Sequence, residues 1–313
     1  MQRRAVPALL LSLVATAGPS PAATNDSTYV VVLGVAQDGG VPQAGTAVHP
    51  GWDDLAKHRT VACLAIVDAR AGKRWLIDCT PDFPEQLHAL DTIAPARTRP
   101  GLDGIFLTHA HIGHYAGLVH LGHEVMGARG VPVYAMPRMA EFLENNGPWD
   151  QLVRYENVAL RVLEDGQPVA LGADLAITPL RVPHRQEYAE VVAYRIQGPN
   201  RSVLYIPDID SWTEWDASGT HIEDQIARVD VAYLDGTFFD NGEIPGRDMS
   251  SFPHPFIANS MSRLAALSAA ERAKVRFIHM NHTNPALWPE SDARHEIEKR
   301  GFGVAEEMER VGL

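Results

Sequence analysis

Short runs of apolar and β-branched residues recur along the chain, separated by stretches rich in glycine, proline and charged side chains. Such runs predict buried strands, which we expect at residues 28–35, 60–68, 74–78, 104–107, 131–135, 158–162, 169–177, 191–196, 203–206, 231–234 and 275–278. Apolar residues at helical spacing predict helices at residues 83–90, 114–126, 137–146, 222–229, 256–267 and 290–300. Because both halves contain both kinds of element, with no flexible linker between them, the pattern indicates a layered α/β domain.

The composition of the 313 residues narrows the class of protein. Hydrophobic residues make up 45% of the chain and charged residues 21%, which favours a large packed core over disorder. The formal net charge is -12. Since an acidic surface repels phosphate backbones, we expect a small-molecule substrate, and no nucleic acid as a general partner.

The N-terminus is typical of an export signal. Arg3 and Arg4 precede an apolar run at residues 5–14, and small residues follow at 18–23. This run is shorter than the roughly 20 apolar residues that a spanning helix needs. We therefore expect a signal peptide at residues 1–23 and a mature domain at residues 24–313, in the periplasm or secreted, with no membrane span after cleavage. The alternative is an uncleaved N-terminal anchor.

Cys63 and Cys79, the two cysteines of the chain, lie on or beside two expected strands that a short turn joins. An oxidising compartment would allow a disulfide between them. Two small buried thiols are the alternative, and the sequence leaves both open. Two cysteines are too few for a zinc site built from thiolates.

Three histidines lie within six residues, directly after the expected strand at 104–107. Residues 107–114 are Leu-Thr-His-Ala-His-Ile-Gly-His. In extended backbone the side chains of His109 and His111 point the same way, and His114 at the start of the next helix can turn back toward them. Imidazole nitrogens suit zinc, iron and other late divalent metals. The cluster therefore predicts a metal site.

This cluster resembles the His-x-His-x-Asp-His motif of the metallo-β-lactamase superfamily, with Gly113 in place of the aspartate. In that family the aspartate serves the second metal, so the resemblance leaves the second site one ligand short, with water to fill the gap. The resemblance implies an α/β fold of the four-layer αββα sandwich type. It also implies one or two Zn2+ ions as cofactor, with iron or manganese as alternatives.

Further elements of the family follow in the family's order. Asp78 resembles the early aspartate that supports the histidine loop. Asp208 resembles the strand-end aspartate that bridges two metals, with Asp210 as a competing choice, and His279 competes with His282 for the last ligand position. The metal ligands that the resemblance implies are His109, His111, His114, His184, Asp208 and His279.

Three segments resemble a narrower branch, which contains coenzyme PQQ synthesis protein B and the PhnP-type phosphodiesterases. They are the glycine loop at residues 33–43 and the segments 234–238 and 277–285. The histidine loop of the PQQ protein is degenerate, whereas this chain keeps three histidines. The likeness therefore favours a relative with a competent metal site.

The resemblance implies an exported hydrolase in which metal-bound hydroxide attacks a small ester, phosphodiester, lactone or amide. By likeness to related phosphodiesterases, His254 would protonate the leaving group and Asp235 would orient it, beside the bridging Asp208. His282 is another choice of general acid. Gln37 and Asp38 follow the first strand and are expected to contact substrate. Plain turn roles for Asp235, His254 and the glycine loop are the alternatives.

Two other functions stay open at this point. One is a metal-dependent redox enzyme like the PQQ synthesis protein, a reading that iron at the site would favour. The other is a non-catalytic metal-binding protein of the periplasm.

Overall fold

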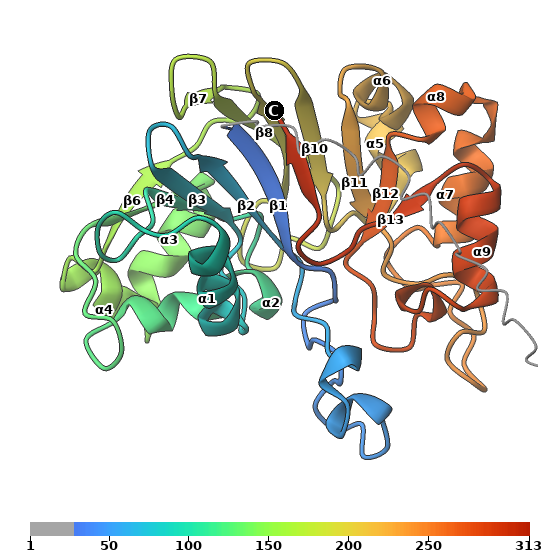
Figure 1. The fold of residues 1–313 in the computed structure, drawn as a ribbon, viewed down its shortest axis with the longest axis horizontal. Helices are drawn as coiled ribbons and strands as arrows, with labels where there is room; N and C mark the ends of the chain where they lie inside the picture. Colours follow the sequence, from blue (N-terminus) through green and yellow to red (C-terminus); the bar gives the residue numbers. More distant parts are fainter. Residues whose placement is uncertain (1–27) are drawn as a thin grey trace, which may run out of the picture.

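The computed structural model describes residues 28–313, and the expected signal peptide lies outside the described residues. Two seven-stranded sheets face each other, and helices cover their outer faces (Figure 1). The four-layer αββα sandwich expected from the sequence is therefore confirmed. Within residues 28–313, no helix combines the length and the apolar character that crossing a membrane requires.

The first sheet has the strand order β14-β1-β2-β3-β4-β5-β6, and β3 to β6 run parallel to one another. Its outer face is covered by α1 to α4 (Figure 1). The strands are β14 (Arg310–Gly312), β1 (Thr28–Gly34), β2 (Cys63–Asp68), β3 (Lys73–Ile77), β4 (Gly104–Phe106), β5 (Val131–Ala135) and β6 (Val158–Val162). The helices are α1 (Phe83–Ile93), α2 (Ile112–Tyr115), α3 (Pro137–Asn145) and α4 (Trp149–Arg154).

The second sheet has the order β13-β12-β11-β10-β9-β8-β7, with β10 to β13 parallel. Helices α5 to α9 lie on its side of the molecule (Figure 1). Its strands are β7 (Val169–Ala170), β8 (Ala176–Arg181), β9 (Val192–Gln197), β10 (Ser202–Ile206), β11 (Val231–Asp235), β12 (Val275–Ile278) and β13 (Gly303–Val304). Its helices are α5 (Trp212–Ala217), α6 (Ile222–Ala227), α7 (Ile257–Arg263), α8 (Ala269–Arg272) and α9 (Asp292–Lys299).

The burial of β1 explains the continuous run of large apolar and aromatic residues at positions 29–33. Val30 and Val32 belong to the core cluster that both sheets share, whereas Tyr29, Val31 and Leu33 belong to the cluster beneath the helices of the first sheet. Successive side chains of a strand point to opposite faces, so a strand buried on both faces needs a continuous apolar run.

Several expected elements differ in detail. The expected strand 169–177 is two strands, because residues 171–175 form a turn in which the Leu171 N–H donates to the Leu175 carbonyl at 2.8 Å. The expected helix 114–126 begins earlier as α2 and continues as a 3-10 helix, Ala116–Leu121. It ends there because Gly122 has extended backbone. Helices α4, α5 and α8 and strands β13 and β14 were not expected.

The two cysteines are free thiols, and both are buried. Cys63 begins β2 and Cys79 follows β3. Of the two alternatives left open by the sequence, the buried thiols are therefore the ones found.

Candidate metal centre

The candidate residues follow the ends of strands from both sheets. Asp78 follows β3 and supports the histidine loop after β4: its Oδ1 accepts hydrogen bonds from the N–H of Thr108 at 2.8 Å and from the Thr108 hydroxyl at 2.9 Å. Its Oδ2 lies 2.7 Å from Nδ1 of His114. This buried carboxylate, whose own φ is 70°, thus fixes both ends of the loop, as the resemblance implied.

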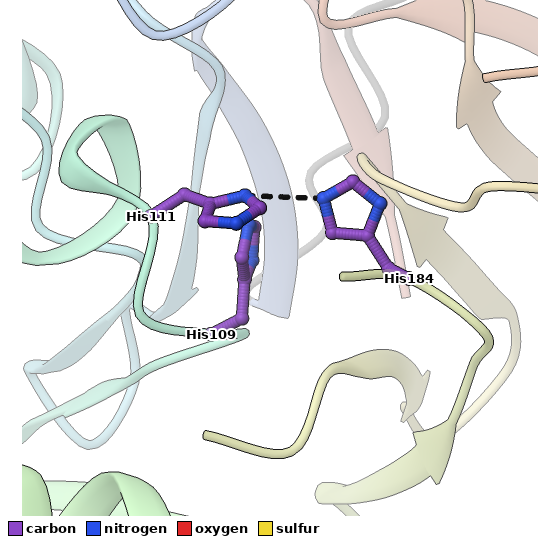
Figure 2. Close-up of side chains that lie close together, drawn as sticks. All are labelled: His109, His111 and His184. Carbon is purple, nitrogen blue, oxygen red and sulfur yellow. Dashed lines mark hydrogen bonds between the residues drawn. The ribbon is translucent and has the colours of Figure 1, made fainter. Parts of the chain in front are cut away.

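His109, His111 and His184 form one group (Figure 2). The first two come from the loop after β4, and His184 comes from the other sheet, just after β8. One ring nitrogen of each lies within 4.8 Å of the others, and Nε2 of His184 is 3.1 Å from Nδ1 of His111. The rings of His109 and His111 meet edge to face, with centroids 4.5 Å apart. Three nitrogens therefore surround one point.

A second group contains His114, His279 and Asp38, again with ligand atoms within 4.8 Å of one another. His279 follows β12 with a φ of 65°, and Asp38 comes from the loop after β1. Oδ1 of Asp38 lies 3.3 Å from Nε2 of His114 and 3.8 Å from Nε2 of His279. Asp38 was expected to contact substrate; the structure instead puts it among the candidate ligands.

Asp208, just after β10, lies between the two groups. Its Oδ2 is 2.9 Å from Nε2 of His114 and 3.3 Å from Nε2 of His279. Its Oδ1 is 3.8 Å from Nε2 of His184. Oδ2 also lies 3.7 Å from Nε2 of His109. The carboxylate of Asp208 therefore lies against both groups, which is the arrangement expected of a bridging ligand.

Five buried polar atoms in this region have no hydrogen-bond partner of acceptable geometry among residues 28–313. They are Nε2 of His109, His114 and His279, Oδ1 of Asp38 and Oδ2 of Asp208. Leaving such an atom unpaired costs about 1–3 kcal/mol, so five that converge call for a ligand in common. Imidazole nitrogens and carboxylate oxygens are donors that divalent metals of the zinc type accept. The residues present therefore fit a metal centre.

The sequence comparisons identify the family of the chain. The family model for the beta-lactamase superfamily domain matches residues 73–280, more than half of the chain. The protein belongs to this family. It is 28% identical to coenzyme PQQ synthesis protein B of Methylorubrum extorquens, over 88% of this chain and 97% of that protein.

Two solved structures share the superfamily fold with this chain. A crystal structure of zinc-bound PqqB from Methylobacterium extorquens matches with a TM-score of 0.75 at 23% identity, over 91% of this chain and 100% of that one. A diphosphatase from the PhnP family matches with a TM-score of 0.63 at 23% identity, over 91% of this chain and 96% of that one.

In this member of the superfamily, the far nitrogen of the buried ligand histidines is also held. Nδ1 of His184 lies 2.7 Å from Oδ1 of Asp210, and Nδ1 of His279 lies 3.1 Å from the Thr237 hydroxyl. Such contacts fix the ring orientation and leave Nε2 to face the metal. Asp210, the competing choice for the bridge, therefore supports His184, and Asp208 holds the central position.

Electrostatics differ between neighbouring histidines of the superfamily loop. Burial, followed by the charge on His114, holds the pKa of His109 well below its usual value. Burial acts against a charge on His114 too, but the carboxylates of Asp78, Asp208 and Asp38 outweigh it and raise its pKa. The lowered pKa of His109 favours its neutral form, which is the form that can coordinate a metal, whereas the raised pKa of His114 favours its charged form beside the three carboxylates.

His254 and Asp235 form a pair beside the bridge. Nδ1 of His254 lies 2.7 Å from Oδ2 of Asp235, at the end of β11, and 3.7 Å from Oδ1 of Asp208. Burial acts to lower the pKa of His254, but Asp235 and then Asp208 outweigh it and raise this pKa to about 9. Both side chains are buried, and the expected partnership between them is found in the structure.

His282 and Gln37 make contacts other than those expected from the sequence. No hydrogen bond or ion pair within residues 28–313 joins His282 to the candidate ligands, so its expected role as general acid finds no support in the geometry. The Gln37 side-chain oxygen accepts a hydrogen bond from the Asn281 amide at 2.5 Å. Gln37 therefore ties two loops together, a role that its position after a strand does not reveal.

Proposed function

We propose that this protein is a zinc-dependent hydrolase with a two-metal centre, acting on a small phosphodiester or related phosphoric ester or anhydride. The observation that carries the proposal is the position of Asp208 between the two histidine groups, with a carboxylate oxygen 2.9 Å from Nε2 of His114 in one group and 3.8 Å from Nε2 of His184 in the other. A pair of metals held in this way suits displacement at phosphorus, because both the attacking and the leaving oxygen can be stabilised. The similarity of fold to a PhnP-family diphosphatase and to zinc-bound PqqB supports the proposal.

The chemistry would be divided among the side chains as follows. A divalent metal would supply a bound water of lowered pKa and would polarise the phosphoryl group whose phosphorus is attacked. His109, His111 and His184 would hold one ion, and His114 and His279 would hold the other, with Asp208 shared.

His254 would supply the proton for the leaving group. Because its Nδ1–H is engaged by Asp235, Nε2 is the nitrogen left to donate a proton. Its raised pKa keeps the ring protonated at neutral pH, which is the state that a general acid requires. Asp235 also accepts hydrogen bonds from the N–H groups of Ile209 and Thr237. These bonds fix the carboxylate, which in turn fixes the orientation of His254.

A role in coenzyme PQQ synthesis is the second candidate. It is favoured by the 28% identity that extends over 97% of the PQQ synthesis protein. Periplasmic location is a further part of the proposal and rests on the sequence of residues 1–23.

The test is metal content together with hydrolysis, on protein purified without chelators. Elemental mass spectrometry should find close to two zinc per chain, and bis(p-nitrophenyl) phosphate should be cleaved. His109→Ala should lose metal and activity, whereas His88→Ala, on α1 and away from the ligand groups, should keep both. Wild-type protein without metal would overturn the proposal. Iron in place of zinc, with no cleavage of phosphoric esters, would favour the PQQ-related role.

A further inference from the structure

Position 113 is a glycine because the structure leaves no room there for a side chain. It lies in α2 between His111 and His114, in helical backbone that any residue can adopt. A Cβ built at this position would lie 2.6 Å from Cα of Asp38 and would overlap Oδ1 of the same residue. Two carbon atoms do not approach so closely, and backbone cannot yield as a flexible side-chain tip can. Asp38 therefore occupies the volume that a side chain at position 113 would need.

The carboxylate that fills this volume faces the second histidine group. Oδ1 of Asp38 lies 3.3 Å from Nε2 of His114 and 3.8 Å from Nε2 of His279. All three atoms are buried and lack a hydrogen-bond partner of acceptable geometry within residues 28–313. A carboxylate that only paired with charged histidines would be expected to form such a bond, so three unsatisfied atoms point to a missing common ligand.

The loop that carries Asp38 is held at several points. The N–H of Gln37 donates to the Met280 carbonyl at 2.9 Å, directly beside His279, and the Gly40 N–H closes a turn onto the Gln37 carbonyl at 2.8 Å. The Gln37 side chain also pairs with Asn281. The position of Asp38 is thus fixed relative to His279, as a metal ligand requires.

We propose that Asp38 is the terminal carboxylate ligand of the second metal ion, supplied by the loop after β1 into the space that Gly113 leaves free. The inference rests on the proposed metal centre. In the superfamily motif an aspartate stands where this chain has Gly113; here the ligand comes from a different part of the sequence and reaches the same region of the site. The match to the family begins at residue 73, so Asp38 lies outside it. The second site is then complete without an extra water.

The experiment titrates metal-free full-length protein with Zn2+ alone, by calorimetry, and measures retained zinc by elemental mass spectrometry. Wild type should bind two ions. Asp38→Ala should bind one as before, with affinity for the other lowered by about 10- to 100-fold or more. Asp38→Asn keeps the volume and removes the charge, so it should weaken the same site and serves if Asp38→Ala fails to fold. Val48→Ala, at an exposed position of the same loop, should retain two ions.

A second pair of variants tests the space argument without touching the carboxylate. Gly113→Ala should push Asp38 away and weaken the second ion as Asp38→Asn does. Gly172→Ala is the matched control, because a Cβ there meets nothing closer than 3.7 Å and the backbone is not left-handed. Thermal unfolding should show that both variants remain folded.

The outcomes separate this inference from the proposed function. If wild type binds two ions and both Asp38 variants bind two with unchanged affinity, the inference is overturned and the hydrolase proposal stands. If the Asp38 variants had a raised KM but unaltered metal binding, Asp38 would contact substrate and would not be a metal ligand, which would also overturn the inference. If wild type binds no zinc, both the inference and the proposed function are wrong.

Discussion

Oδ2 of Asp235 lies 2.7 Å from Nδ1 of His254, and the two residues are buried next to the bridging carboxylate of Asp208. Nδ1 of His254 lies 3.7 Å from Oδ1 of Asp208, and His254 belongs to neither of the two histidine groups. His254→Ala should therefore keep its zinc and lose about 10²- to 10⁴-fold in kcat, the usual size of a general-acid contribution. Steady-state kinetics and metal analysis of the same sample would check this.

A matched comparison is available for that variant. His221→Ala removes a half-exposed histidine that also pairs with an aspartate, Asp216, at 2.8 Å, but belongs to none of the candidate ligand groups. Its kcat should equal that of wild type. If His254→Ala lost its metal, or kept full activity, a role in proton transfer would be wrong.

Removal of metal should lower the melting temperature. Ligands that bind only the folded state stabilise it by about 2.7 kcal/mol when present at a hundred times their Kd, which for a chain of this size corresponds to several degrees. Calorimetric scans before and after dialysis against a chelator would show the shift. His109→Ala should show a smaller shift, since it lacks one ligand of the first group. Identical melting curves for wild type would contradict a metal centre.

The thiols of Cys63 and Cys79 should be inert in the folded protein. Burial, followed by the charge of Asp78, raises the pKa of both thiols well above its usual value. A thiol reagent such as DTNB should therefore label neither residue under native conditions and both in denaturant. An intact mass lower by two hydrogens would instead reveal a disulfide.

An ion-pair network away from the candidate metal centre should give a pH-dependent contribution to stability. Hydrogen bonds from Arg263, at 2.8 Å, lower the pKa of Asp216 from 3.8 to about 2. A lowered pKa means that the stabilisation is complete above pH 3.8 and is lost as the pH falls through about 2. Because the carboxylate is partly exposed, the contribution should stay below about 1 kcal/mol.

The measurement for this network is the free energy of urea unfolding for wild type and for Arg263→Ala. The difference between them should be constant from neutral pH down to about 5 and should shrink on further acidification. A difference that grew as the pH fell would mean that Asp216 is not stabilised in its charged form.

The sequence predicts the parts of the structure that depend on local pattern or on a compact motif. The runs of β-branched residues locate β1, β5, β6 and β12, and the spacing of His109, His111 and His114 identifies the metal loop. Strands β13 and β14 escape prediction because two or three residues carry no period, and they become strands only by pairing with β12 and β1.

The role of Asp38 could not be predicted, for a related reason. Its distance from His114 depends on how the loop after β1 packs against α2, and these segments are far apart in the chain. The glycine at position 113 was visible in the sequence, but it indicated a missing ligand. Only the structure reveals that Asp38 occupies the volume of a side chain at position 113, which is why we propose Asp38 as the replacement for the missing ligand.

The ligand groups draw on loops from both sheets, beginning with Asp38 near the start of the described chain and ending with His279 near its end. A growing polypeptide therefore cannot assemble the centre until almost all of it has left the ribosome, and neither half would hold it alone. Metal would therefore bind late in folding, and the amount of metal bound would depend on how well the two sheets have packed together. A preparation with normal secondary structure but misaligned sheets should be recognisable by its low zinc content alone.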